Sequence, residues 1–430
     1  MNKNKTNWVA VFTMMFIFGM ISFVTNLAAP MGVIWKQAPG IDGSNTLGMM
    51  GNMMNFLAYL FMGIPAGKCI TKYGYKKTTL LGVGVGFVGV LIQFLSGKVG
   101  VGMTVGSIPA NFFIYLLGAF VCGFSVCILN TVVNPMLNLL GGGGNKGNQL
   151  VQIGGTFNSL MGTLTPMLVG ALIGAVTADT VITDVNLVLY MAMGVFAATF
   201  FILMFVPFVE PEQETSNASV KSLFKYRHLV YGVIAIFVYV GVEIGIPGTL
   251  NFYLADPDSG AGLDPANAAT IAGFVAGTYW FLMLVGRFSS SLISGKVSSK
   301  MQLGVTSATA IILVIAAMFS TSVKTSMPVF TGSGFEMVQV PLTALLLVLC
   351  GLCTSVMWGT IFNLAVEGLG KQSALASGLF MMMVVGGGII PLLQNAIADA
   401  TSYMTSYWIL VASLAYICWF AFVGSKVKNV

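Results

Sequence analysis

Long apolar stretches alternate with short polar segments along the whole chain. A bilayer core of about 30 Å needs about 20 apolar residues per helix, and the chain has twelve stretches of this kind. They lie near residues 8–35, 46–70, 77–97, 110–139, 150–177, 187–208, 229–254, 266–292, 302–322, 340–364, 373–400 and 405–424. The most hydrophilic segment, 210–228, separates six of them from the other six. The pattern predicts an all-α membrane protein with 12 transmembrane helices.

The composition agrees with this pattern and excludes a water-soluble protein. Hydrophobic residues make up 57% of the 430 residues and charged residues only 7%, against about 25% charged residues in a soluble globular domain. So few charges could not cover a soluble surface of this size, which excludes cytosolic enzymes, secreted domains and disordered chains. The first apolar run begins at Trp8 and has no small-residue cleavage site. We therefore expect a retained first helix instead of a signal peptide.

Lysine and arginine predict the orientation of the chain, because these residues accumulate in cytoplasmic loops. With a cytoplasmic N-terminus, only Lys36, Lys98 and Lys324 of the 19 basic residues face outward. We predict a multi-pass protein of a bacterial cytoplasmic membrane, surrounded by lipid, with both termini in the cytoplasm. The net charge of +6 reflects this topology. Nucleic-acid binding is excluded, because it would need a basic patch on a soluble face.

The two halves of the chain resemble each other. Gly162 stands four residues before Pro166, and Gly387 stands four residues before Pro391, so both residues of the pair recur after 225 positions. Parallel six-helix repeats place a substrate site between the halves, near the middle of the bilayer. The predicted parts are an N-terminal six-helix bundle at 1–208, a cytoplasmic central loop at 209–228 and a C-terminal six-helix bundle at 229–430.

Seven segments spread over both halves carry distinctive residues. They are PAGKCITKYGYKK at 65–77, LNTVVNPMLNLL at 129–140, GGTFNSLMGTLTP at 154–166, VYVGVEIG at 238–245, GRFSSSLIS at 286–294, WGTIFNLAVEGLG at 358–370 and GGGIIP at 386–391. These segments resemble the major facilitator superfamily, and within it the fucose permease branch of fucose, galactose and glucose symporters. The resemblance implies two pseudo-symmetric six-helix bundles and a monomeric, alternating-access sugar transporter, usually coupled to protons.

Two acidic residues of that branch are replaced here. Members that resemble fucose permease carry an aspartate late in the first helix and a glutamate in the fourth, just before the T-x-x-N-P run. Alignment to the family places Ala29 and Asn130 at these positions. An amide can bind a hydroxyl group but cannot carry a proton through a transport cycle. The usual coupling groups are therefore missing at both positions.

Glu243 is the candidate for proton coupling. It lies about 15 residues into the seventh apolar stretch, which at 1.5 Å per residue places it near the middle of the bilayer. A carboxyl group there costs several kcal/mol if it is charged and unpaired, and such residues are functional by default. Glu243 would accept a sugar hydroxyl or carry the coupling proton. The alternative is a carboxyl group that only ties its helix to a neighbour.

Sugars are bound by amide and carboxylate hydrogen bonds and by aromatic faces. Residues of these types in the predicted helices are the candidates for substrate contact. They are Asn26, Asn130, Asn134, Gln152, Asn158, Tyr239, Glu243, Trp358, Asn363 and Gln394. Asn130 and Asn134 are four residues apart and share a helix face, whereas Gln152 and Asn158 lie on different faces. Trp358 is the expected stacking residue, and Tyr279 and Trp280 are expected to pack between helices or at the membrane interface.

Four basic residues are candidates for a gating or structural role. Arg287 stands at the cytoplasmic end of the eighth predicted helix, and Lys72, Lys76 and Lys77 lie in the turn after the second. No metal or cofactor is expected, because the CxxC of Cys350 and Cys353 has no second pair and no nearby histidine.

Three interpretations remain open. The first is a transporter of a hexose, deoxyhexose or amino sugar, either coupled to protons through Glu243 or acting as a uniporter. The second is an exporter of drugs or small metabolites, which would have a more apolar cavity with fewer amide side chains. The third is a membrane sensor, which would usually carry a soluble output domain, although the most hydrophilic segment here spans only 210–228. An enzyme is not expected, since no nucleophile or metal set converges in the sequence.

Overall fold

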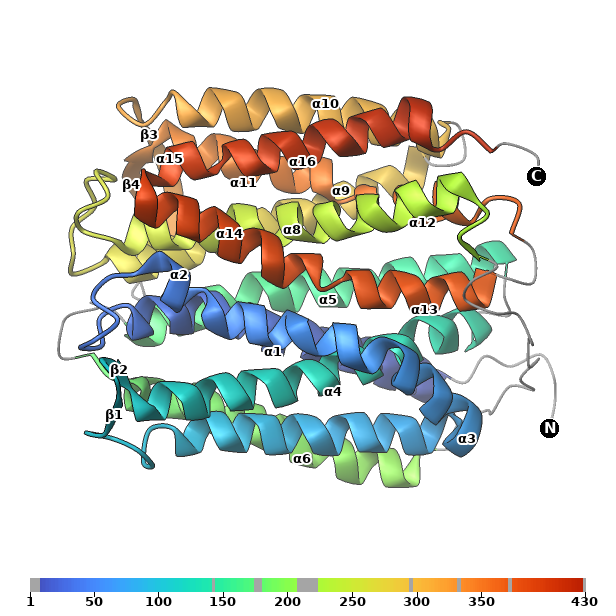
Figure 1. Cartoon of the computed structure of the whole chain (residues 1–430), viewed down its shortest axis with the longest axis horizontal. Helices are drawn as coiled ribbons and strands as arrows, with labels where there is room; N and C mark the ends of the chain where they lie inside the picture. Colours follow the sequence, from blue (N-terminus) through green and yellow to red (C-terminus); the bar gives the residue numbers. More distant parts are fainter. Residues whose placement is uncertain are drawn as a thin grey trace.

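The computed structural model describes residues 8–140, 144–173, 180–206, 223–293, 297–330, 334–369 and 373–427. Within these ranges the chain is mostly helical, and the long helices run side by side along one axis (Figure 1). The first helix begins, and the last one ends, at the same end of the bundle. We call the opposite end, which carries residues 36–44, 96–109, 256–267, 319–330 and 334–341, the distal end.

The N-terminal half contains the first part of the helical bundle. Its elements are α1 (Trp8–Trp35), α2 (Asn45–Gly48), α3 (Met50–Leu95), β1 (Thr104–Val105), β2 (Ile108–Pro109), α4 (Ala110–Leu140), α5 (Gly144–Ile173), η1 (Ile182–Val185) and α6 (Asn186–Phe205). Helix α3 packs mainly against α4, and α1 packs mainly against α5. The strands β1 and β2 form a short antiparallel pair at the distal end.

The C-terminal half repeats this arrangement with more interruptions in its helices. Its elements are α8 (Arg227–Ala255), α9 (Ala268–Ile293), α10 (Ser299–Met318), β3 (Lys324–Phe330), β4 (Phe335–Pro341), α11 (Leu342–Thr354), α12 (Met357–Val366), α13 (Ser373–Met383), α14 (Gly386–Ala400), α15 (Tyr403–Ser406), α16 (Trp408–Trp419) and η3 (Phe420–Gly424). Three spans are built from consecutive pieces: α11 with α12, α13 with α14, and α15 with α16 and η3.

The twelve-helix fold predicted from the sequence is confirmed. Eleven helical segments among the described residues are long and apolar enough to cross a membrane. Helix α5, whose first residues read GNKGNQ, is more polar but runs alongside the others as the twelfth span (Figure 1). All backbone groups of a membrane span must be satisfied within the protein, and helices achieve this inside one segment.

One local feature was expected from the sequence and one was missed. The turn expected between residues 70 and 77 is present as a kink within α3, where two helices meet at one non-helical residue, Gly74, with φ 81° and ψ 171°. Glycine tolerates that left-handed backbone because it has no Cβ. The structure also contains an antiparallel hairpin, with Lys324 paired to Pro341 and Phe330 to Phe335. It was missed because the search for apolar spans does not detect strands that lie outside the bilayer.

The two halves meet along α5 and α9 and along α3 with α13 and α14. Small residues allow the first contact: a Cβ at Gly273 would stand 2.4 Å from the carbonyl oxygen of Pro166, and one at Gly170 would stand 2.9 Å from that of Ala269. Such close backbone approach is typical of helix pairs in membranes. Most of the predicted central loop, 209–222, lies outside the described residues, so the proposed boundaries between the parts stay a prediction.

Candidate functional site

An ion pair lies deep within the bundle, between α8 and α9. Nη2 of Arg287 stands 3.6 Å from Oε1 of Glu243, with 19% and 13% of the two side chains exposed. Glu243 is the 17th of the 29 residues of α8, which places it in the middle of the span. A charged carboxylate there is costly without a partner. Arg287 provides that partner from the same half of the molecule.

Arg287 also reaches the other half. Its Nη1 donates to the carbonyl oxygen of Gly155 at 3.0 Å and to Oγ of Ser159 at 3.0 Å, both on α5. The guanidinium group has five donors in a fixed fork, so one nitrogen can hold Glu243 while the other holds α5. The predicted gating or structural role of Arg287 stays a prediction, but its contacts link the candidate coupling residue to the N-terminal bundle.

Buried tyrosine hydroxyl groups lie close to Glu243. The Tyr239 side chain is in hydrogen-bonding contact with Glu243, and its hydroxyl donates to the carbonyl oxygen of Thr354 at 3.2 Å. The Tyr279 hydroxyl lies 2.8 Å from Oγ1 of Thr354. Both tyrosines are fully buried, so Tyr239 faces the protein interior in this state of the molecule. A proton on Glu243 therefore changes the pattern of donors and acceptors in this cluster.

The amide candidates of the N-terminal half each hold a neighbouring group. Asn26 donates to the carbonyl oxygen of Ser22 at 2.9 Å and to its hydroxyl at 3.1 Å. Asn130 donates to the Tyr59 hydroxyl at 2.7 Å. Both amides keep a carbonyl oxygen beyond these bonds, and Asn130 keeps a second N–H. These groups remain candidates for contact with a substrate.

Two further amides of this half make helix contacts, and a third cannot be placed. Asn134 donates to the carbonyl oxygen of Asn130, one turn earlier, at 3.3 Å. Asn158 donates to the carbonyl oxygen of Phe18 at 3.0 Å and so ties α5 to α1. The side chain of Gln152 lies outside the described part of the structure. Substrate contact by these three residues stays a prediction.

The candidates on α12 and α14 lie in different surroundings. Trp358 is half-buried and packs edge-on against Tyr239, with ring centroids 6.3 Å apart. Asn363 is exposed on α12. Gln394 is fully buried, and neither of its amide atoms has a hydrogen-bond partner among the described residues. An unpaired buried amide costs about 1–3 kcal/mol, and substrate contact by Gln394 stays a prediction.

A narrow cavity lies between the two halves, distal to the ion pair. It is lined from α1, α3, α5, α8 and α9 by Thr25, Asn26, Ala29, Pro30, Met49, Asn52, Pro166, Ile244, Pro247, Gly248, Asn251, Ala276 and Trp280. Of the predicted substrate residues it contains Asn26. It adds Asn52 and Trp280, which the sequence analysis did not select, and Asn251, which lies on α8 two turns beyond Glu243. Amides facing one tryptophan make a surface suited to a polar ring compound.

The basic residues around the kink in α3 lie near the end of the bundle where α1 begins. Nζ of Lys76 donates to the carbonyl oxygen of Met204 at 2.9 Å and ties α3 to the end of α6. Nζ of Lys72 lies 5.2 Å from the centroid of the Tyr73 ring. Lys77 is exposed. The gating or structural role expected of these three lysines stays a prediction.

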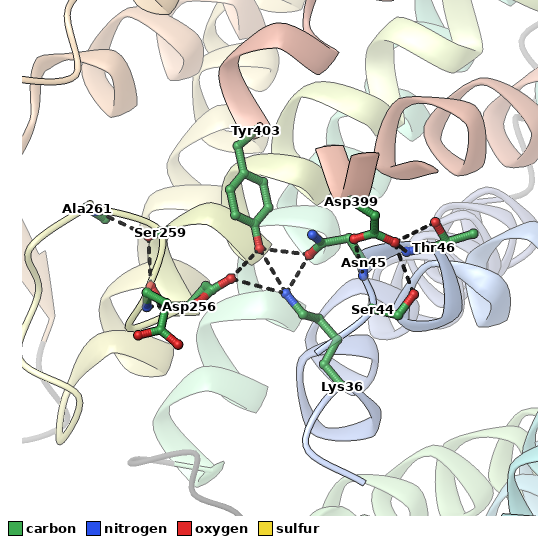
Figure 2. A network of polar contacts seen from close by, with 10 residues as sticks. Lys36, Ser44, Asn45, Thr46, Asp256, Ser259, Ala261, Asp399 and Tyr403 are labelled. Carbon is green, nitrogen blue, oxygen red and sulfur yellow. Dashed lines mark hydrogen bonds and ion pairs between the residues drawn. The ribbon is translucent and has the colours of Figure 1, made fainter. Parts of the chain in front are cut away.

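A second polar cluster, which the sequence analysis missed, lies at the distal end (Figure 2). Lys36 contacts Asp256, Asn45 and Tyr403, and Asp399 contacts residues 44–46. One signal was available: Lys36 is one of only three basic residues on the side that carries few of them. Its partners come from segments far apart in the chain, so the sequence alone did not bring them together.

Three comparisons with known proteins agree with this geometry. A family model described as Major Facilitator Superfamily matches residues 11–391. A glucose/galactose transporter of Brucella abortus is 30% identical over 434 residues, which cover 99% of this chain and 96% of that protein. A putative glucose/galactose transporter of Helicobacter pylori is 29% identical and covers 86% of each chain. The crystal structure of a variant of the Escherichia coli fucose:proton symporter matches with a TM-score of 0.68 at 18% identity, covering 98% of this chain and all of that one.

Proposed function

The chain belongs to the major facilitator superfamily, and from this premise we propose that it carries a sugar across the membrane by alternating access. The observation that carries the proposal is the cavity between the two halves, with Asn26, Asn251 and Trp280 in its wall. The similarity over nearly full length to proteins named as glucose/galactose transporters supports a hexose, or a related deoxyhexose or amino sugar, as the substrate.

The substrate site in this proposal combines amide donors and acceptors with one aromatic face. Asn26 of α1 and Asn251 of α8 would bind sugar hydroxyl groups from opposite halves. Trp280 would cover the apolar face of the ring. Asn251 is 3% exposed and Trp280 is 5% exposed, so a sugar must separate the halves slightly to enter.

Glu243 would carry the coupling proton in place of the two acids that the fucose permease branch usually has. When ionised, it is held by Arg287. When protonated, it can donate to the Tyr239 hydroxyl, while Tyr239 keeps its bond to Thr354. Arg287 would then be held only by Gly155 and Ser159 of α5. Protonation would thus change how tightly the two halves are tied, which links proton binding to the rocking of the halves.

A uniporter is the second candidate, and a specific observation favours it. Ala29, which lines the cavity, and Asn130 stand where the branch usually has acids, and neither can bind a coupling proton. If Glu243 is permanently ionised by Arg287, the chain would only equilibrate sugar across the membrane. The two candidates differ in one measurable property, the accumulation of sugar above equilibrium.

The orientation belongs to the proposal as well. Lys36, Lys98 and Lys324 lie at the distal end, and the other basic residues of the described chain lie toward the end where α1 begins. Because basic residues accumulate on the cytoplasmic side, the distal end would face the outside of a bacterial cytoplasmic membrane. The protein would work there as a monomer, with lipid around the bundle.

The test is uptake of labelled glucose, galactose, fucose and N-acetylglucosamine into proteoliposomes, with and without an inward proton gradient. We expect saturable uptake of at least one hexose, with competition between related sugars. A sugar that accumulates only with the gradient supports proton symport, and one that equilibrates regardless of the gradient supports the uniporter. Absence of uptake for the whole panel, in vesicles of confirmed folded protein, would refute the sugar class.

A further inference from the structure

The distal cluster joins segments from both halves of the molecule (Figure 2). Lys36 directly follows α1, and Asn45 begins α2, so both belong to the N-terminal half. Asp256 directly follows α8, and Tyr403 begins α15, so both belong to the C-terminal half. None of these residues was selected for function from the sequence. Together they make a polar connection across the line where the halves meet.

Lys36 is the centre of this connection. Its Nζ donates to the Tyr403 hydroxyl at 2.9 Å and to Oδ1 of Asn45, and it lies 3.6 Å from Oδ2 of Asp256. The ammonium therefore donates two hydrogen bonds and has one carboxylate beside it as an ion-pair partner. Nζ also lies 5.0 Å from the centroid of the Phe252 ring, within the range of a cation–π contact.

The surroundings of Lys36 explain why it needs so many partners. The side chain is only 5% exposed, whereas Asp256 is 24% exposed. Burial lowers the pKa of Lys36, and the carboxylates of Asp256 and Asp399 oppose this effect. The Tyr403 hydroxyl stands 2.7 Å from Oδ2 of Asp256 and 2.8 Å from Oδ1 of Asn45, and it can donate to one of them at a time. The charge is kept in the interior only while both halves supply their groups.

Asp399 forms a second connection from the C-terminal half to α2. Its Oδ1 accepts from the backbone N–H of Asn45 at 2.7 Å. Its Oδ2 accepts from the backbone N–H of Thr46 at 2.8 Å, from the Thr46 hydroxyl at 2.6 Å and from the Ser44 hydroxyl at 3.0 Å. One carboxylate thus holds the first turn of α2, and α2 in turn holds Asn45 beside Lys36.

Close packing beneath the cluster seals the same region. A Cβ on Gly32 of α1 would stand 2.9 Å from Cζ of Phe252 on α8 and 2.3 Å from the carbonyl oxygen of Gly48 on α2. The backbone of α1 therefore meets α2 and the α8 aromatic ring with no room for a larger residue. Polar and apolar contacts thus join the two halves between the cavity and the distal end.

The energetics of such a cluster suit reversible closure. Taking two charges out of water costs about as much as their attraction returns, so a buried ion pair is close to neutral in net stability. When the halves separate at the distal end, water can replace the lost partners of Lys36, Asp256 and Asp399. Breaking the intact cluster is therefore inexpensive, while removing only one partner leaves the other buried and unpaired.

We propose that Lys36, with Asp256, Asn45 and Tyr403, is the gate that closes the transport path at the distal end, and that it opens and reforms in each transport cycle. Asp399 holds α2 so that Asn45 can take part. The proposal rests on alternating access, the premise of the proposed function, and does not depend on which substrate is carried. Lys36 thereby determines how long the cavity stays closed to the distal side.

The test measures access to the cavity from each side. Ala29, which lines the cavity, is replaced by cysteine, and labelling with a membrane-impermeant maleimide is followed in intact cells and in inverted membrane vesicles. Labelling of the chain without Ala29→Cys gives the background, which is small because four of the native cysteines are buried and Cys69 and Cys418 lie away from the distal end. Asp256→Asn and Lys36→Met are then introduced separately.

In both variants we expect labelling from the distal side to rise about fivefold or more and labelling from the opposite side to fall, because the closed state loses a partner that the open state does not use. Lys98→Met is the matched control, since Lys98 is exposed at the same end and lies over Phe94 of its own half, 4.9 Å from the ring centroid. It should leave both rates unchanged. If Lys36→Met does not fold, Asp256→Asn, which keeps the shape of the side chain, decides alone.

Unchanged labelling in the folded gate variants, or an equal change in Lys98→Met, would overturn the proposal. The measurement needs no sugar, so its outcome is separate from that of the uptake panel. A rise in distal labelling together with a failed sugar panel would support the gate and refute the substrate. Normal sugar uptake with unchanged labelling would support the sugar as substrate and refute the gate.

Discussion

Two ion pairs lie in the core of this molecule at the same nitrogen–oxygen distance, 3.6 Å, yet in different surroundings. Glu243 and Arg287 meet in the middle of the spans, both from the C-terminal half. Lys36 and Asp256 meet at the distal end, one from each half. The inner pair depends on the charge of a single carboxyl group, whereas the outer pair depends on the two halves being together.

The neighbours of each pair indicate what it can respond to. Glu243 has one cation and the buried hydroxyl of Tyr239 beside it, so gain of a proton changes its partners. Lys36 has an amide, a phenol and a carboxylate that come from both halves, so it keeps all of its partners only while the halves are together. Equal distances therefore do not mean equal roles. We expect the inner pair to couple transport to protons and the outer pair to control access.

The largest expected effect is the loss of sugar accumulation in Glu243→Gln. A gradient of about one pH unit stores about 1.4 kcal/mol per proton, enough for about tenfold accumulation of a neutral sugar. Glutamine keeps the shape and the hydrogen bonds of the carboxyl group but cannot exchange a proton. The accumulation ratio in proteoliposomes should fall to about one, while exchange of sugar across the membrane continues. A normal ratio in this variant would remove Glu243 from the coupling mechanism.

A large effect on stability is expected from Arg287→Met. Removing one partner of a buried ion pair costs about 3–5 kcal/mol, and the partial exposure of the two side chains reduces that cost. Thermal unfolding in detergent should shift to clearly lower temperature, and adding Glu243→Gln should restore part of the loss because no buried charge is left unpaired. If the double variant is no more stable than Arg287→Met, the pair does not hold the two helices as described.

Much of the fold was predictable, because twelve apolar stretches of bilayer length leave few other arrangements. Glu243 was predictable for the same reason, since a carboxyl group stands out in an apolar span. The outer pair was not, because Lys36, Asp256 and Tyr403 lie in loops and helix ends where charges are ordinary. Their importance arises only when folding brings together positions that are 147 to 367 residues apart. Which tryptophan lines the cavity was not predictable for a similar reason, because it depends on the rotation of α9 and α12; the stacking role of Trp358 stays a prediction.

A moderate effect is expected from replacing Trp280, and it would place the substrate in the cavity between the two ion pairs. Trp280 lines the cavity, while Trp358 packs against Tyr239. Stacking of an aromatic ring contributes about 0.5–1.5 kcal/mol beyond the buried area, so Trp280→Ala should raise the half-saturating sugar concentration about tenfold and Trp280→Phe about twofold. Trp358→Phe is the comparison variant and should change it less than Trp280→Phe does. The opposite order would return the stacking role to Trp358, as the sequence predicted.

The smallest effect is expected from Tyr403→Phe. The variant keeps the ring, which packs against Tyr253 with centroids 5.6 Å apart, and removes only the hydroxyl that accepts from Lys36. A single hydrogen bond contributes about 0.5–1.5 kcal/mol. Labelling of Ala29→Cys from the distal side should therefore rise about two- to threefold, less than in Asp256→Asn. An effect as large as that of Asp256→Asn would mean that the hydroxyl, not the ion pair, holds the gate.

The difference between the pairs is tested most directly by proton movement that sugar itself induces. Parent protein, Glu243→Gln and Asp256→Asn are placed in lightly buffered proteoliposomes, and the pH outside is followed after addition of the sugar that the parent takes up fastest. We expect the outside to become more alkaline with the parent and with Asp256→Asn, at rates that differ, and to stay unchanged with Glu243→Gln although sugar still enters. Proton uptake that persists in Glu243→Gln, or that is lost in Asp256→Asn while sugar still enters, would contradict the separation of coupling from gating.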